Sequence, residues 1–198
     1  MVNREKDIVD LLRSKGWICK KDEVGDWYCI LDLGDRNIQV IPSFKKTGDT
    51  SSLALLESVS TEQFTNLENR VFEHGEQSDH SPFIRPWNSK YTKKGEAITC
   101  DDVLELIDGI AEWAKNQDIE AAVAEYSKKC PDSPGQKQLY HLVALIMTKD
   151  VGTLKNYEDY FKSGNTLNFV PMITYDVIKR AVELAKYTNN DQNIRAKK

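Results

Sequence analysis

The chain has 198 residues, of which 40% are hydrophobic and 29% are charged, a composition typical of a globular protein. Its net charge of -4 argues against nonspecific binding to nucleic acid, because neutralising phosphates requires clustered Lys and Arg. The first ten residues are highly charged, and no run approaches the roughly 18 apolar residues of a membrane span. We therefore expect a cytoplasmic protein with no signal peptide and no membrane or nucleic-acid partner.

The first third of the chain is expected to form one helix and then three strands. Residues 4–15 carry apolar side chains at helical spacing, and Gly16 is suited to end the helix. Residues 20–25 are expected to form a polar turn. Three runs rich in β-branched, aromatic and aliphatic residues then predict an antiparallel meander: 27–33, 36–44 and 53–59. Gly34-Asp35 is typical of the two-residue turn between the first two strands.

Alternation along the meander predicts one apolar face and one mixed face. Trp27, Cys29, Leu31 and Leu33 share the first face, and Ile38 and Val40 are placed to face the same core. The second face combines apolar and polar side chains: Tyr28, Ile30, Asp32, Arg36, Gln39 and Ile41. A half-apolar outer face is either covered by more of the chain or used for binding.

Helices dominate the prediction after residue 60. Residues 61–74 form a helix that we expect to cover a sheet face. The segment 76–99 is either short strands near 81–87 and 90–98 or a long irregular loop, and both alternatives stay open. Thr99 is expected to cap the strongest helix, 101–115, and a further helix continues through Tyr126.

The clearest boundary is the Pro- and Gly-containing segment 130–135, beyond which only helix patterns occur. We therefore expect an α+β protein in which residues 1–130 form an antiparallel β-meander covered by helices. Residues 131–188 are expected to form an all-helical extension packed on it. Residues 189–198 are expected to be a disordered tail.

The motif search predicts no enzyme, no cofactor and no metal. Phosphate-binding glycine loops, the nucleophile elbow and H-E-x-x-H are all missing from the sequence. The cysteines form no C-x-x-C pair, so we expect reduced thiols: Cys19, Cys29, Cys100 and Cys130. His74 and His80, with nearby acids, are interpreted as a polar helix end that runs into a loop rather than as a metal site. His141 lies on an apolar helix and is expected to have a packing role.

The strongest functional indication is a set of acidic residues near aromatic ones. Aromatic side chains supply desolvated contact area and charges steer an oppositely charged partner, so the combination is typical of a protein-binding surface. The predicted partner-binding residues are Asp22, Glu23, Asp26, Glu76, Asp79, Phe83, Trp87 and Tyr91. The three aromatics of this set lie among prolines and polar residues and are expected to be partly exposed. Trp17 and Trp27 have an alternative interpretation as core residues.

Two families are similar to this chain in different respects. The order of helix 4–15, strands 27–59, helix 61–74, strands 81–98 and helix 101–115 resembles that of type III secretion chaperones, which bind other polypeptides. Size, acidity and the lack of catalytic motifs resemble the immunity proteins of bacterial contact-dependent growth inhibition. That second resemblance implies a monomeric, stoichiometric inhibitor covering the active site of a basic cognate toxin, often a nuclease. A dimeric chaperone and an enzyme with an unrecognised site remain the alternatives.

Overall fold

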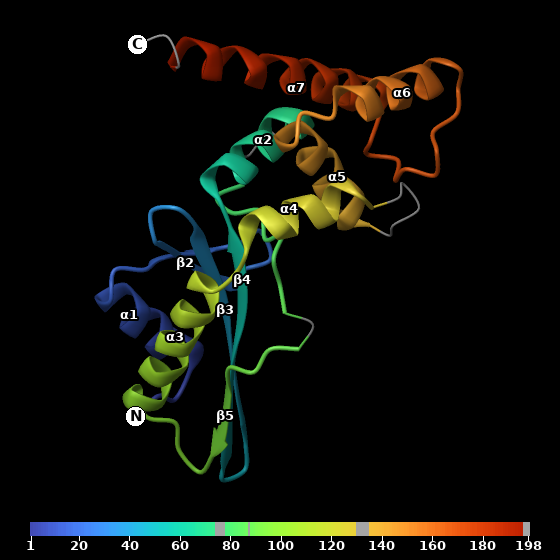
Figure 1. Ribbon diagram of the computed structural model, residues 1–198. Helices are drawn as coiled ribbons and strands as arrows, with labels where there is room; N and C mark the ends of the chain where they lie inside the picture. The colour runs from blue at the N-terminus through green and yellow to red at the C-terminus, as the bar shows by residue number, and fades with distance from the viewer. Residues whose placement is uncertain (74–77, 87, 130–134, 196–198) are drawn as a thin grey trace. The chain divides into compact units, whose positions relative to one another are not determined.

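The computed structural model (Figure 1) describes residues 1–73, 78–86, 88–129 and 135–195, with side chains up to residue 187. It confirms the α+β class: an antiparallel sheet is formed in the N-terminal half, and most helices follow it. The chain divides into two compact units. Unit 1 comprises Met1–Glu62 and His80–Gln117, and unit 2 comprises Gln63–Asp79 and Asp118–Lys198. This division differs from the boundary after residue 130 that the sequence indicated.

Unit 1 contains a five-stranded sheet and two helices. Its elements are α1 (Glu5–Ser14), β1 (Ile18–Lys21), β2 (Trp27–Asp32), β3 (Asn37–Thr47), β4 (Thr50–Ser60), β5 (Thr92–Gly95) and α3 (Cys100–Lys115). The strands follow chain order and all neighbours are antiparallel. The predicted meander corresponds to β2, β3 and β4. The expectation of a polar turn over 20–25 was wrong for residues 20 and 21, because β1 extends to Lys21.

The helices α1 and α3 cover one face of this sheet (Figure 1). Ile8 and Leu12 on α1, and Ile110 on α3, are fully buried. The sheet contributes Val40 and Leu55 to the same core, also fully buried. Because strand side chains alternate between faces, the remaining residues of β3 and β4 point to the opposite, outer face.

Both ends of α3 are fixed by side chains. Thr99 Oγ1 accepts a hydrogen bond from the Asp102 backbone N–H at 3.1 Å, and Asp102 Oδ2 accepts one from the Thr99 N–H at 2.8 Å. At the other end, Arg36 Nη1 donates to the carbonyls of Ala114 and Gln117, each at 2.8 Å. These contacts satisfy backbone groups that have no partner within the helix.

Cys19 and Cys29 form a disulfide, so the expectation of reduced thiols was wrong for this pair. The two residues lie directly opposite each other on β1 and β2, and both are buried. Directly opposed residues of antiparallel strands bring their Cβ atoms close enough for such a bond. The strand β1 was not among the strands predicted from the sequence, so this pairing was not predicted. Cys100 is an exposed free thiol, and Cys130 lies outside the described residues.

The segment 78–99 combines both alternatives that the sequence left open. Where a strand near 81–87 was expected, one bridge forms between Ile84 and Val59. Where a strand over 90–98 was expected, β5 forms, together with one bridge between Ile98 and Val2. The Leu55 N–H donates to the Tyr91 carbonyl at 3.0 Å. The described parts of the segment therefore follow the edge of β4.

Unit 2 is helical in its described residues. Its helices are α2 (Glu62–Phe72), α4 (Ile119–Ser127), α5 (Gln136–Met147), α6 (Val151–Lys162) and α7 (Tyr175–Arg195). The residues from Gln138 to Ile146 on α5 are all buried, so this helix forms the centre of the unit. We expected α2 to cover the sheet, but it belongs to this unit, where Phe64 packs edge-on against Tyr140. The helix α7 continues through Arg195, into the segment for which we expected a disordered tail.

Candidate binding surfaces

The predicted acids of the β1–β2 turn are exposed, but their side chains have different roles. Asp22 accepts hydrogen bonds from the backbone N–H groups of Val24 at 3.1 Å and Asp26 at 2.8 Å. Its carboxylate therefore holds the turn in shape. Glu23 and Asp26 are exposed acids next to Val24, whose side chain is 82% exposed. Of the remaining predicted acids, Asp79 is exposed in unit 2, and Glu76 lies outside the described residues.

The predicted aromatic anchors are less accessible than expected. Phe83 is only 2% exposed, so the expectation that it is partly exposed was wrong. Ile84 bridges to Val59, and this pairing draws the proline-flanked segment into the core. Tyr91 is half-buried and its hydroxyl donates to the Gly109 carbonyl on α3 at 2.8 Å. Trp87 lies outside the described residues.

The alternative interpretation as core residues applies fully to Trp17 and only in part to Trp27. Trp17 is buried, with 4% exposure, whereas Trp27 is half-buried. The Arg13 guanidinium lies 5.0 Å from the centre of the Trp27 ring, and the Lys21 ammonium lies 5.1 Å from it. The ring therefore carries cations at its surface rather than acids.

Four exposed carboxylates form a stripe along the outward face of α3, which the sequence analysis missed. The acidic stripe consists of Asp101, Glu105, Asp108 and Glu112. Their spacing of four, three and four residues places them on one side of the helix. Among the described residues, none of the four has a Lys or Arg at ion-pair distance. The neighbouring Asp102 does pair with Lys93 at 2.7 Å, and this contact and Thr99 lower the pKa of Asp102 to about 2.

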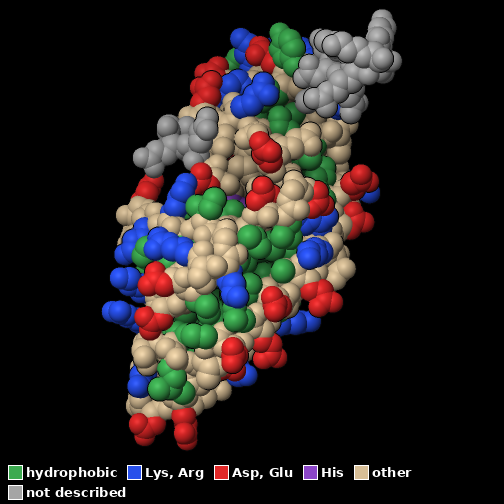
Figure 2. Space-filling view, turned by 90° about the vertical axis from the view of Figure 1, so that its left-hand side faces the viewer, with side chains coloured by type: hydrophobic (Ala, Val, Ile, Leu, Met, Phe, Trp, Pro, Cys, Tyr) green, Lys and Arg blue, Asp and Glu red, His purple; other side chains and the backbone are tan. Residues whose placement is uncertain are grey.

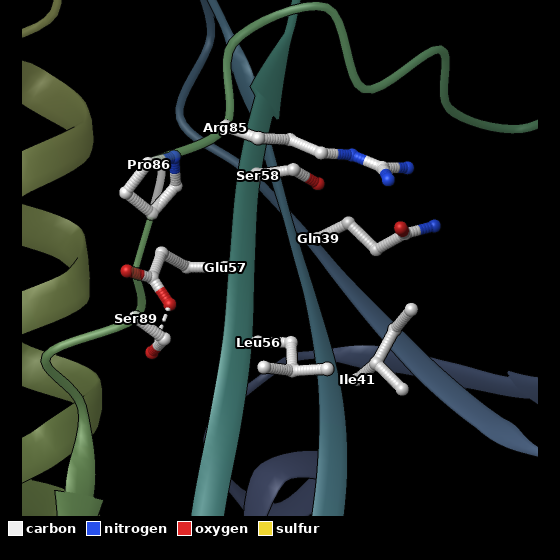
Figure 3. Close-up of a pocket in the computed structure, with 8 residues that line it drawn as sticks. All are labelled: Gln39, Ile41, Leu56, Glu57, Ser58, Arg85, Pro86 and Ser89. Carbon is white, nitrogen blue, oxygen red and sulfur yellow. Dashed lines mark hydrogen bonds between the residues drawn. The ribbon is translucent and has the colours of Figure 1, made fainter.

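The outer sheet face, on the side of the sheet away from α1 and α3, is the second candidate surface. Register places Ile41 beside Leu56 and Gln39 beside Ser58 on this face. Figure 3 shows the Arg85 side chain extending past Ser58 toward Gln39, while Glu57 and Ser89 lie on the other side of β4. Together these residues and Pro86 line a pocket of about 220 Å³. Such a volume is below the roughly 300–1,000 Å³ typical of small-molecule sites, so the pocket fits a single protruding side chain better than a substrate.

The histidines in the described residues are held in buried, neutral environments. His80 is 4% exposed, its Nε2 is hydrogen-bonded to Ser58 at 3.1 Å, and burial and then Arg85 lower its pKa to about 3. The His141 Nδ1–H donates to the Tyr126 carbonyl at 2.8 Å, so Nε2 accepts from the Tyr157 hydroxyl at 3.0 Å. Burial lowers the pKa of His141 as well. The packing role predicted for His141 is thereby confirmed. His74 lies outside the described residues.

No group of three or more His, Cys, Asp or Glu side chains is arranged to hold a metal ion within the described residues. None of the helices in the part of the chain that the structure describes combines the length and apolarity needed to cross a membrane.

Comparison with known proteins identifies the family to which the chain belongs. No curated protein and no solved structure is significantly similar to the chain. A family model, described as a family of unknown function (DUF6990), matches residues 4–186. Because the match covers most of the sequence, the chain belongs to the DUF6990 family.

Proposed function

We propose that this protein is a stoichiometric inhibitor that binds a basic protein partner, most simply an immunity protein that neutralises a cognate bacterial toxin such as a nuclease. The observation that carries the proposal is the acidic stripe on α3. Exposed acids three and four residues apart repel one another along a helix and destabilise it. A basic partner removes that repulsion when it binds, and opposite charges raise the rate of association.

The acids of the β1–β2 turn extend the same argument. Glu23 and Asp26 are exposed, and the backbone that carries them is fixed by Asp22. A rigid acidic turn costs little conformational entropy on binding. Val24 at its tip supplies an apolar contact between the charges.

An inhibitor that protects its own cell acts in the cytoplasm, and this compartment bears on the Cys19–Cys29 bond. Cytoplasmic thiols are mostly kept reduced. The proposal therefore requires that the chain still binds its partner when both cysteines are reduced. Binding measured with and without a thiol reductant checks this requirement.

The experiment starts from a protein cross-linked to the tagged chain in its native cells and identified by mass spectrometry. The candidate is then produced recombinantly, and its association with the purified chain is measured by surface plasmon resonance at two salt concentrations. We expect Asp108→Lys, in the middle of the stripe, to slow association about tenfold at low salt. Glu183→Lys is the matched control, since Glu183 is an exposed acid within α7 of unit 2, and it should change the rate less than twofold.

Equal effects of the two substitutions would refute the role of the acidic stripe. Inhibition of the partner's activity by the chain is the second measurement, because binding without inhibition would refute the inhibitor function. A purified chain that turns over a substrate alone, with activity lost on substitution of one His or Cys, would replace the proposal with an enzyme.

A secretion-type chaperone is the second candidate, and the outer sheet face favours it. Leu56 is 50% exposed there and Ile18 is 64% exposed, so the sheet offers apolar area to an extended polypeptide. Sedimentation distinguishes the two candidates: a homodimer favours the chaperone, and a monomer favours the inhibitor.

A further inference from the structure

We propose that the outer sheet face of unit 1 is a docking site for an extended polypeptide segment in which apolar and acidic side chains alternate. This inference goes beyond the proposed inhibition, because the acidic stripe on α3 selects a basic surface whereas this face selects an acidic one. It shares with that proposal the premise that the protein acts by binding polypeptides, and it specifies the charge and side-chain pattern of a ligand for the face that the second candidate function uses.

The centre of the outer sheet face is apolar. Register places Ile18 beside Ile30 at one side of the sheet and Ile41 beside Leu56 in the middle. Ile18 is 64% exposed and Leu56 is 50% exposed, while Ile30 and Ile41 are half-buried. Exposed apolar side chains on adjacent strands form one patch rather than isolated residues, and such patches mark interaction sites.

Cations surround this centre. Register places Lys45 and Lys94 on either side of Ser52, so all three share the outer sheet face. Both lysines are exposed, and among the described residues neither has an acid at ion-pair distance. Lys20 lies beside Tyr28 on the same face. Figure 2 displays the opposite side of unit 1, which carries α1 and α3, and there acidic, basic and hydrophobic side chains are interspersed.

Asp32 is the acid that the strands place on this face, and its carboxylate stabilises a turn. Its carboxylate accepts the backbone N–H of Gly34 at 2.7 Å, in the turn that follows β2. The charge of the outer sheet face is therefore positive, although the whole chain has a net charge of -4. A partner of opposite charge is acidic.

The pocket beside Leu56 indicates how one residue of the segment would be held. Arg85 is exposed and reaches over Ser58 (Figure 3), and no described acid lies at ion-pair distance from it. Its guanidinium can bind a carboxylate through two parallel hydrogen bonds. The side-chain amide of Gln39 and the methyl groups of Ile41 and Leu56 line the same pocket. Glu57 also lines the pocket, but its carboxylate lies on the other side of β4 and accepts a hydrogen bond from Ser89 at 2.6 Å. A single acidic side chain therefore fits, with its carboxylate at Arg85 and its methylene groups against Ile41 and Leu56.

A polypeptide fits these features better than a membrane or a nucleic acid. Membrane binding at an interface requires an apolar side that enters the lipid, whereas Ile30 and Ile41 are half-buried within the sheet. Single-stranded nucleic acid is bound by stacking on several aromatic side chains, whereas the five strands place one aromatic residue, Tyr28, on this face. Alternating side chains of an extended peptide match the two-residue period of the strands.

The test is an NMR titration of the isotope-labelled full chain with two designed eight-residue peptides. One alternates Glu or Asp with Leu or Val, and the other carries Lys at every acidic position. We expect the acidic peptide to shift the amide signals of β2, β3 and β4, with an affinity at least tenfold higher than that of the basic peptide. Leu56→Glu and Arg85→Glu should each weaken acidic-peptide binding at least tenfold. The matched control is Met172→Glu, since Met172 is 52% exposed in unit 2, and it should leave binding unchanged.

Several outcomes would overturn the inference. These are equal binding of both peptides, shifts from the acidic peptide confined to other elements, and no binding of either peptide at millimolar concentration. Binding to vesicles of phosphatidylserine and phosphatidylcholine that Leu56→Glu abolishes, without peptide binding, would assign the face to a membrane instead. None of these outcomes changes the prediction for Asp108→Lys, so failure here is distinguishable from failure of the inhibitor proposal.

Discussion

His80 makes the stability of unit 1 depend on pH in a way that can be calculated. Its pKa is about 3 in the folded chain and 6.5 in its ordinary state, because burial disfavours the charged ring and Arg85 adds repulsion. For a base with a lowered pKa, the stabilisation is fully present above pH 6.5 and is lost as the pH falls from 6.5 toward 3. Protonation of the unfolded chain is the cause, since that state binds the proton first.

The magnitude follows from the two pKa values. Each pH unit below 6.5 costs about 1.4 kcal/mol until the folded chain is protonated too. Between pH 7.5 and pH 5, unfolding free energy should therefore fall by about 2 kcal/mol through His80. Carboxylates contribute little in this window, because their ordinary pKa values lie near 4.

Urea unfolding at pH 7.5 and pH 5, monitored by tryptophan fluorescence, measures this contribution of His80 to the unfolding free energy. The three tryptophans among the described residues, Trp17, Trp27 and Trp113, belong to unit 1. We expect His80→Gln to be less stable at pH 7.5 but to lose most of the pH dependence. His141→Gln, which changes a histidine of unit 2, should keep the pH dependence seen by these probes. An unchanged pH dependence in His80→Gln would refute the reasoning.

Three further substitutions test the packing of unit 1 in the same unfolding assay. Arg36→Ala should lower the unfolding free energy by about 2–3 kcal/mol, because it removes charge-assisted hydrogen bonds to the end of α3. Arg36→Lys should lower the unfolding free energy less, and equal losses for the two substitutions would refute the role of the guanidinium. Joint replacement of Cys19 and Cys29 by Ala should cost about 2–3 kcal/mol, since the bond closes a loop over a sequence separation of 10; an unchanged midpoint would contradict it. Gly109→Ala should destabilise the protein by about 1 kcal/mol or more, because a Cβ there would lie 2.8 Å from Cε1 of Tyr91. In a Tyr91→Ala background the same Gly109→Ala substitution should instead stabilise the protein by about 1 kcal/mol, the ordinary gain of Ala over Gly in a helix.

Local patterns were enough to predict most elements of the fold. Helix spacing located α1, α3 and the helices of unit 2, and strand runs located β2, β3 and β4, because each pattern reports burial of one face. The short edge strand β1 escaped because only one of its four residues is buried. With β1 missing, the pairing of Cys19 with Cys29 could not be predicted either.

The candidate surfaces depended on information that a linear sequence does not carry. Phe83 stands among prolines and polar residues, but pairing of Ile84 with Val59 brings it into the core. The acidic stripe on α3 was present in the spacing of Asp101 to Glu112, and reading the polar face of the helix as well as its apolar face would have found it. The cationic outer sheet face required the register between β3, β4 and β5, which sets Lys45 and Lys94 around Ser52.

Titration of the identified partner with the purified chain tests the central claim most directly, with calorimetry and the partner's own activity followed together. A stoichiometric inhibitor binds its partner in equimolar amounts and reduces that activity in proportion, reaching full inhibition at one equivalent. Loss of the partner's activity at a small fraction of an equivalent would show turnover by this chain and would contradict the account.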